Sequence, residues 1–196
     1  SHWIDTRAGR IFARSGGSGE PLVLLHGFPQ THVMWHRVLP ALMRRYSVVA
    51  MDLRGYGWSS APASEGGTEY SKRAMADDVI DVMEELGHVR FMLAGHDRGA
   101  RVGYRLALDH PGRLSKLALL DIIPTCEVWT NIEAGRAPAA HWGFLSGPAP
   151  APEDEIKKGP DAYFEGLMSK WNASGDLKPF DPRALKEYRA AWGDAS

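Results

Sequence analysis

The chain has 196 residues, 44% of them hydrophobic, which is typical of one globular domain, with or without a small addition, and excludes a disordered protein. Its 23 Lys and Arg residues nearly balance 24 Asp and Glu residues, and the net charge of −1 argues against a nucleic-acid binder or a polybasic membrane-surface protein. The single cysteine, Cys126, excludes a disulfide framework and a cysteine-based zinc site, and no apolar run approaches the ~20 residues of a transmembrane helix.

Four short apolar runs predict strands that are buried on both faces of a parallel sheet. These runs are Leu22–Leu25, Val48–Met51, Phe91–Ala94 and Leu117–Leu120. Apolar residues at helical spacing predict a helix over Ser71–Leu86, with Ser71 as its N-cap, and a second helix spans Arg98–Asp109. Alternating strands and helices indicate an α/β doubly wound sheet, which binds ligands at the carboxyl ends of its strands.

The composition changes near residue 125. Eight of the 13 prolines lie from Pro124 onward, and four of the seven tryptophans follow Cys126. Within this second part, Gly147–Pro152 alternates proline with small residues, which predicts a stiff, extended stretch. We therefore expect two parts, residues 1–125 and residues 126–196.

The segment Gly95-His96-Asp97-Arg98-Gly99 follows a predicted strand and opens a predicted helix. This is the setting of the nucleophile elbow G-x-S-x-G, whose glycines allow a sharp turn and close packing. With aspartate in place of serine, the Asp97 carboxylate can displace a leaving group from a saturated carbon and form an ester. The alternative is that Asp97 is only the N-cap of the helix.

Two arginines follow in the first turn of that helix. Arg98 and Arg101 are three residues apart, so they share a helix face. Cations are disfavoured at a helix N-terminus by ~0.3–1 kcal/mol each, so the pair points to an anion. Asp97 is one anion, and a substrate carboxylate held by the guanidinium groups would be a second. The alternative is a pair of solvated arginines that bind Asp109 or Asp77.

The loop after the first predicted strand begins His26-Gly27-Phe28. In this topology that loop supplies one backbone N–H of an oxyanion hole, and the residue after the nucleophile supplies the other. The predicted donors are therefore the N–H groups of Phe28 and Arg98. For His26 we expect a structural role, bonding the backbone.

Two further positions carry candidate polar chemistry. Asp121 ends the strand that follows the elbow helix, so its carboxylate could orient a catalytic histidine, or it could be a cap or turn residue. His141 and Trp142 carry ring N–H donors that could hold a departing halide, or they could only pack in a core.

Several segments together resemble one family, the haloacetate dehalogenases of the α/β-hydrolase fold. They are His26–His32, Gly55–Ser59 and above all Gly95–Val102. The sequence similarity continues through His141-Trp142 to Phe180–Ala184. The resemblance covers nearly the whole chain. It implies a mostly parallel sheet, here the α/β-hydrolase core of residues 1–125, with residues 126–196 as a helical cap.

The resemblance also implies a role for each candidate residue. Asp97 is the nucleophile, Arg98 and Arg101 bind the substrate carboxylate, Asp121 orients the catalytic histidine, and His141 and Trp142 stabilise the halide.

The implied reaction is hydrolysis of a haloacetate, such as fluoroacetate to glycolate and fluoride, through an ester on Asp97 and without a metal or organic cofactor. The family's last core strands and its catalytic histidine do not match any segment here, so we expect the chain to be a fragment and that histidine to lie beyond Ser196. The expected partner is a small haloacid, without nucleic acid or membrane, and a homodimer is compatible with the sequence. The start of the chain shows no secretory leader, which favours a cytoplasmic protein.

Two other functions remain open from the sequence. An epoxide hydrolase of the same fold shares the aspartate elbow, but it needs tyrosine donors in the cap and leaves Arg101 without a role. A chain that lacks the base could also be a binder that captures a haloacid or a carboxylate without turnover.

Overall fold

The computed structural model describes residues 1–7, 9–64, 66–136 and 140–193. It divides the chain into two compact units, Ser1–Ile122 and Ile123–Ser196, where the sequence predicted parts of 1–125 and 126–196. Each unit is described by itself.

The first unit is built on a six-stranded mixed sheet with the order β1-β2-β4-β3-β5-β6. The strands are β1 (His2–Thr6), β2 (Gly9–Gly16), β3 (Glu20–Leu25), β4 (Tyr46–Met51), β5 (Phe91–His96) and β6 (Leu114–Leu120). The four predicted strands are confirmed as β3 to β6, and they are parallel to one another. The antiparallel strands β1 and β2 were not predicted.

The parallel strands are covered on both faces. Val23 and Leu25 of β3 face the core formed with α2 (Lys72–Glu85) and α3 (Arg98–Asp109). Leu22 and Leu24 face a second core, which the 3-10 helix η1 (His32–Arg37) and α1 (Leu39–Leu42) complete. This arrangement explains the continuous apolar runs of β3, β4 and β5, whose residues are buried or half-buried on one face or the other. The prediction of burial on both faces is wrong for the run Leu117–Leu120 of β6, which is exposed.

Helix α2 begins as its sequence predicts. The Ser71 hydroxyl accepts a hydrogen bond from the Ala74 N–H at 3.2 Å, so Ser71 is the N-cap. The short 3-10 helix η2 (Thr68–Tyr70) leads into it. The predicted apolar stripe is buried against the sheet, and its members are Met75, Val79, Val82 and Met83.

Strand β6 is the last strand of the sheet, and it pairs only with β5 among the described residues. Its side chains are more exposed than those of the other parallel strands. Leu117, Leu119 and Leu120 are 36%, 45% and 41% exposed. An edge strand of this kind has backbone groups and apolar side chains available to a further element.

The described residues of the second unit form helices joined by turns, and no strand is found among them. Its helices are α4 (Thr125–Glu133), α5 (Ala140–Leu145), α6 (Ala151–Lys157), α7 (Pro160–Lys170) and α8 (Pro182–Gly193). Helices α7 and α8 pack together, with Tyr188 fully buried and the rings of Phe164 and Trp192 5.1 Å apart. The prediction of an extended stretch over Gly147–Pro152 is wrong. The chain turns there and enters α6, because proline suits the first turn of a helix, where no N–H is needed.

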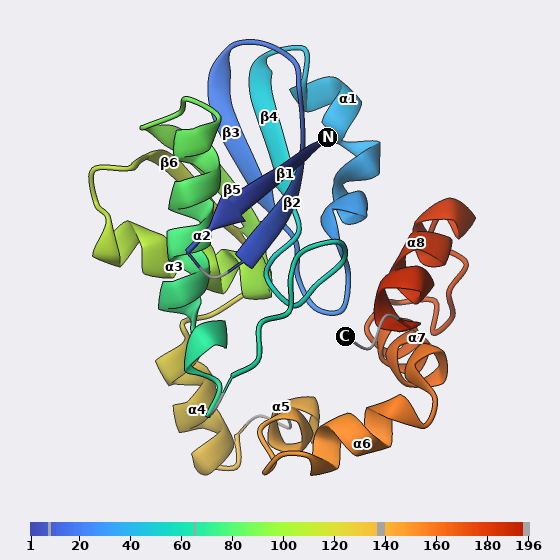
Figure 1. Cartoon of the computed structure of the whole chain (residues 1–196). Coiled ribbons are helices and arrows are strands. Elements are labelled where there is room, and N and C mark those ends of the chain that lie inside the picture. Colours follow the sequence, from blue (N-terminus) through green and yellow to red (C-terminus); the bar gives the residue numbers. More distant parts are fainter. Residues whose placement is uncertain (8, 65, 137–139, 194–196) are drawn as a thin grey trace. The chain divides into compact units, whose positions relative to one another are not determined.

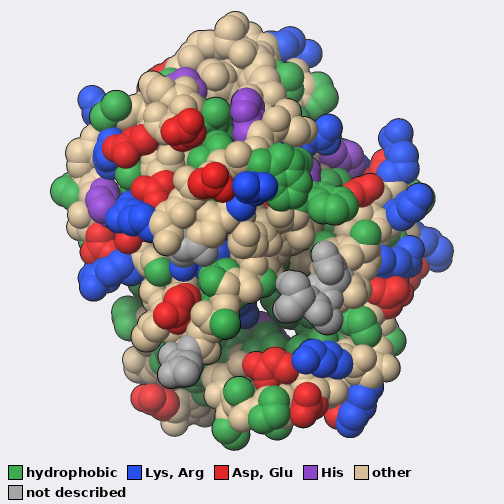
Figure 2. Space-filling view, in the orientation of Figure 1, with side chains coloured by type: hydrophobic (Ala, Val, Ile, Leu, Met, Phe, Trp, Pro, Cys, Tyr) green, Lys and Arg blue, Asp and Glu red, His purple; other side chains and the backbone are tan. Residues whose placement is uncertain are grey.

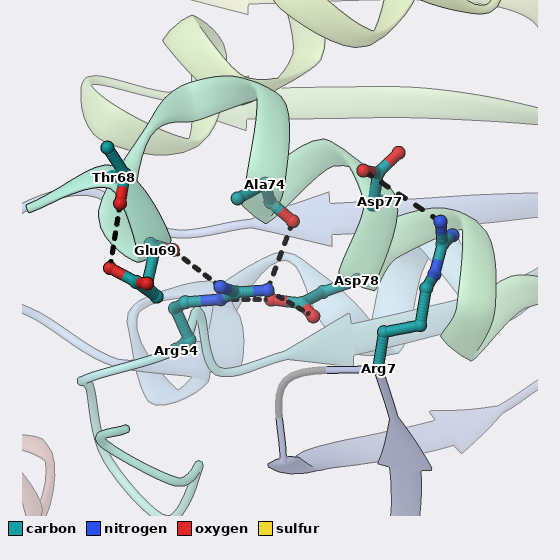
Figure 3. A pocket seen from close by; sticks show the side chains of 7 residues that line it. All are labelled: Arg7, Arg54, Thr68, Glu69, Ala74, Asp77 and Asp78. Carbon is teal, nitrogen blue, oxygen red and sulfur yellow. Dashed lines mark hydrogen bonds and ion pairs between the residues drawn. The ribbon is translucent and has the colours of Figure 1, made fainter. Parts of the chain in front are cut away.

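Away from the elbow, a cavity of about 260 Å³ lies between α2, η2 and the loops after β1 and β4. Figure 3 shows Arg54 extending beneath η2 and α2, where its guanidinium binds the Asp78 carboxylate through two bonds of 2.7 Å. The same guanidinium donates to the carbonyl groups of Glu69 and Ala74. Both charged side chains are buried, so this ion pair connects the loop after β4 to the middle of α2.

Basic and acidic side chains are interspersed over the face in view in Figure 2, in keeping with the net charge of −1. None of the described helices is long and apolar enough to cross a membrane. The described residues also hold no group of three or more His, Cys, Asp or Glu side chains placed to bind a metal ion.

Candidate active site

Asp97 lies at the turn between β5 and α3, with φ of 46° and ψ of −112°. Positive φ is uncommon for any residue with a side chain, and such strained positions gather at functional sites. The Asp97 side chain makes no cap hydrogen bond to α3. Asp97 thus occupies the N-cap position of α3, but its side chain does not cap the helix, which argues against the alternative of a cap role alone.

The turn is tight because two glycines bring backbones into close contact. A Cβ atom on Gly95 would lie 2.5 Å from the Gly99 carbonyl oxygen, and one on Gly99 would lie 2.5 Å from the Leu25 carbonyl oxygen. Real Cβ atoms do not approach backbone so closely, so both positions require glycine. The Gly99 N–H also donates to the His26 carbonyl at 3.0 Å, which fastens the elbow to the loop after β3.

The Asp97 carboxylate faces that loop. Its Oδ1 accepts a hydrogen bond from the Phe28 N–H at 2.9 Å. Phe28 is one of the two donors that the sequence predicted for an oxyanion hole. The other, the N–H of Arg98, follows Asp97 directly at the start of α3. The structure thus brings the predicted nucleophile, Asp97, and the first of its predicted donors together.

The loop that carries Phe28 is held by buried polar groups. His26 is fully buried, with Nδ1 3.1 Å from the Gly27 carbonyl and Nε2 accepting from the Leu53 N–H at 3.0 Å. Burial lowers the pKa of His26. Both ring nitrogens bond the backbone, which is the structural role expected for this histidine.

A second buried side chain, Asp52, fixes the far end of the loop. Its carboxylate accepts from His32 at both the N–H, 2.7 Å away, and Nδ1, 2.9 Å away, and from the Trp58 N–H. Burial works to raise the pKa of Asp52, but hydrogen bonds and attraction from His32 outweigh it, so the pKa lies below its usual value. The loop that presents Phe28 is therefore anchored at both ends.

The two predicted arginines differ in their surroundings. Arg101 is only 7% exposed, which excludes the alternative of a solvated surface arginine. The two carboxylates offered as surface partners bind other side chains: Asp109 binds Arg73 and Arg105, and Asp77 binds His110 and Arg7. Arg98 is half-buried, and its guanidinium lies over the Phe28 ring, 5.0 Å from the ring centre.

Two more polar side chains lie beside the elbow that the sequence patterns did not predict. Tyr56 packs edge-on against His26, and burial raises the pKa of its hydroxyl, while Arg98 and its hydrogen bond oppose that shift. Lys72 is the first residue of α2, and burial is the main cause that lowers its pKa to about 8. A signal for Lys72 was available, since a cation at a helix N-terminus is the same anomaly that singled out Arg98 and Arg101.

Asp121 directly follows β6 and also has a positive φ, 57°. Its side chain is 89% exposed, and its Oδ2 lies 3.8 Å from Nε2 of His96. The Asp97 N–H donates to the Leu120 carbonyl at 3.2 Å, so Asp121 and Asp97 stand at the ends of adjacent strands. The predicted role of Asp121 in orienting a catalytic histidine stays a prediction.

His141 and Trp142 are consecutive residues of α5 in the second unit. The His141 ring lies edge-on to Trp171 at 5.1 Å, and the Trp142 ring lies edge-on to Trp129 at 5.4 Å. Both side chains are half-buried. Each therefore has a packing contact, and the predicted halide role stays a prediction.

Residues 20–189 match the model of the alpha/beta hydrolase fold family. The chain belongs to the α/β hydrolases. That family assignment agrees with the sheet, the elbow and the loop after β3 described above.

Three relatives show the range of proteins that the chain is similar to. It is 51% identical over 181 residues to a fluoroacetate dehalogenase from Burkholderia sp., an alignment that covers 91% of this chain and 59% of the relative. It is 43% identical over 115 residues to a soluble epoxide hydrolase from Corynebacterium sp. strain C12, covering 59% of this chain and 39% of the relative. A solved structure from Nostoc sp. PCC 7120, named as an alpha/beta hydrolase, matches with a TM-score of 0.94 and 48% identity, over 98% of this chain and 66% of that chain. The chain thus spans less than two thirds of the length of these relatives.

Proposed function

We propose that this chain belongs to a hydrolytic dehalogenase that acts on haloacetates through an ester on Asp97. The observation that carries the proposal is the Asp97 carboxylate at a strained elbow, with Oδ1 held by the Phe28 N–H and two arginines on the helix that follows. The 51% identity to a fluoroacetate dehalogenase supports the same reaction class.

In the first step, an oxygen of Asp97 attacks the α-carbon of the haloacetate and the carbon–halogen bond breaks. The electron pair of that bond leaves with the halide, and Asp97 becomes an ester that carries the substrate's carboxylate. Because Oδ1 is held by the Phe28 N–H, Oδ2 is the oxygen available for attack. Arg98 and Arg101 bind the carboxylate and orient the α-carbon, since guanidinium groups match a carboxylate in shape and charge.

In the second step, water attacks the Asp97 carboxyl carbon, glycolate leaves, and a proton is released. The negative charge of this step develops on the former Oδ1, which already faces the Phe28 N–H at 2.9 Å. A donor placed before the reaction stabilises the oxyanion without reorganisation. The base that activates the water is the histidine that the resemblance implies, oriented by Asp121.

The test is to incubate the purified protein with fluoroacetate and to measure released fluoride together with the intact protein mass. Many fluoride ions per chain would establish a dehalogenase with turnover. One fluoride ion and a stable mass gain on the Asp97 peptide would show that alkylation occurs without hydrolysis, as in a capturing protein. A folded protein that gives neither fluoride nor adduct contradicts the proposal.

Replacing Arg101 by leucine is expected to weaken haloacetate binding, raising KM by about 10- to 100-fold, with a smaller change in kcat. The reason is that a leucine side chain would retain apolar packing but could not pair with a carboxylate. The matched control is Arg105→Leu, which removes a cation of the same helix that binds Asp109. Steady-state kinetics with chloroacetate measure both variants. An unchanged KM for haloacetate in Arg101→Leu would contradict the role of Arg101 in binding the carboxylate.

Replacing His141 by alanine is expected to slow fluoride release at least about tenfold more than chloride release, because fluoride is the poorer leaving group and depends more on placed donors. His141→Phe is the matched control, since it keeps a ring against Trp171 but has no N–H donor. Halide release from fluoroacetate and chloroacetate measures the ratio. Equal losses with both substrates, or full activity of His141→Phe, would indicate that His141 only packs.

The second candidate is epoxide hydrolysis, which uses the same aspartate elbow. It is favoured by the 43% identity to a soluble epoxide hydrolase over 115 residues. The buried Arg101 argues against it, since a neutral epoxide has no carboxylate for a guanidinium group to bind. Turnover of a neutral epoxide without any halide release from haloacetates would decide for this alternative.

A further inference from the structure

Lys72 is a half-buried ammonium that the proposed reaction does not use. It begins α2 directly after the N-cap Ser71. Its Nζ lies 3.5 Å from the Tyr70 carbonyl oxygen and 3.6 Å from the Met75 sulfur. Among the described residues no carboxylate lies within 4 Å of it, so its charge is not neutralised by an ion pair.

The charged groups that face Lys72 belong to the elbow and to α3. Burial is the largest cause of its lowered pKa; Arg98 and Arg101 lower it further, and Asp97 works in the opposite direction. Helices α2 and α3 pack side by side (Figure 1), so both helices direct a cation from the first turn to the same region. Three cations therefore share this region with one carboxylate, Asp97.

Such a group of like charges is unfavourable in the empty protein. Each cation also lies at a helix N-terminus, where the helix dipole disfavours positive charge. An alternative role for Lys72 is to cover apolar surface around Met75 with its side-chain stem. That role explains neither the absence of a carboxylate partner nor the two arginines nearby. A bound anion offsets this excess of positive charge.

The proposed reaction brings two anions together, because a carboxylate nucleophile must approach a substrate that is itself a carboxylate. The attack leaves the total negative charge in the site unchanged. Asp97 becomes a neutral ester, but the substrate's carboxylate remains and a halide ion appears. Two negative charges are present before and after the step. Arg98 and Arg101 alone only balance them, and Lys72 makes the surroundings positive throughout.

We propose that Lys72 is a specificity-determining residue whose positive charge attracts small α-halocarboxylates to Asp97 without contacting the reacting carbon. This inference rests on the proposed function. It assigns Lys72 to the capture of the anionic substrate and predicts that the effect depends on charge rather than on side-chain shape.

The experiment measures the single-turnover halide burst from chloroacetate in the whole protein and in three variants. Lys72→Met removes the charge and keeps the unbranched stem. Lys72→Arg keeps the charge. Arg73→Met removes a neighbouring cation that binds Asp109 on the surface, so it changes the net charge equally. Thermal unfolding of each variant monitors the fold.

Lys72→Met is expected to lower the second-order burst rate about tenfold, mainly through weaker saturation, while Arg73→Met changes it less than about twofold. Lys72→Arg is expected to retain most of the wild-type rate. The wild-type burst rate should also fall as pH rises through about 8, since the Lys72 ammonium is charged below its pKa and neutral above it. Lys72→Arg should keep its rate across that pH range, and Lys72→Met should show no such fall.

The inference is overturned if Lys72→Met and Arg73→Met react alike, or if the fall near pH 8 persists in Lys72→Arg. If Lys72→Met does not fold, the pH profile of Lys72→Arg still decides. A wild-type protein that releases no halide from any haloacetate would instead overturn the proposed function. The two failures are therefore distinct.

Discussion

Replacing Asp97 by asparagine is expected to abolish halide release, with a loss of more than about 10⁴-fold. An amide oxygen is a poor nucleophile toward a saturated carbon, and Asp97 is the carboxylate that the Phe28 N–H holds in place. The intact mass should show no adduct after incubation with haloacetate.

Asparagine is the suitable replacement because of the backbone at this position. Asparagine has nearly the same size and shape as aspartate, so it adds no volume at this turn, where Asp97 has φ of 46° and ψ of −112°. The variant should therefore keep its fold, which circular dichroism can verify. Asp109→Asn is the matched control, since it changes a carboxylate that only binds Arg73 and Arg105. Sustained halide release by a folded Asp97→Asn variant would falsify the assignment of the nucleophile.

Replacing Asp78 by alanine is expected to lower the free energy of unfolding by about 3–5 kcal/mol, because it leaves the Arg54 guanidinium buried without its counter-ion. The two side chains are 5% and 3% exposed and share two bonds of 2.7 Å. The Asp78 carboxylate also accepts from the Thr6 hydroxyl at 3.0 Å, which ties β1 to α2. Figure 3 shows the Arg54–Asp78 pair beneath η2 and α2.

Urea unfolding measures this loss, and two further variants define its cause. Arg54→Met combined with Asp78→Leu removes both charges, and it should cost clearly less than Asp78→Ala, since no charge is then left unpaired. Asp5→Ala breaks an exposed ion pair with Arg10 and should change stability little. If Asp78→Ala is no more destabilising than Asp5→Ala, the pair makes no structural contribution.

The sequence by itself determined the core of the fold. The runs Leu22–Leu25 and Val48–Met51 are too short and too continuously apolar for anything but strands buried on two faces, and both were found so. The strand and helix that flank Asp97 are also local features, since two glycines, a buried apolar run and a helical pattern are all readable within a few residues. The same local signals located Phe28, Arg98 and Arg101.

Strands β1 and β2 could not be predicted in this way. Their sequences are partly polar. Pairing with β4 and burial of Ile11 and Ala13 stabilise β2, and β1 in turn pairs with β2. The prediction for Gly147–Pro152 was wrong for a similar reason, because proline is compatible both with an extended segment and with the first turn of a helix. Packing against neighbouring elements decides between the two conformations, and the local sequence does not contain that information.

The tertiary structure alone decided how the candidate site is organised. A carboxylate such as Asp97 can cap a helix or stand free, and the hydrogen bond from Phe28, 69 residues away along the chain, decided the case. Lys72 shows the same dependence, since its lowered pKa arises from burial and from arginines of another helix. Local sequence specifies which chemistry a residue can offer, whereas desolvation and long-range charge, which determine whether that chemistry is used, arise only when distant segments pack together.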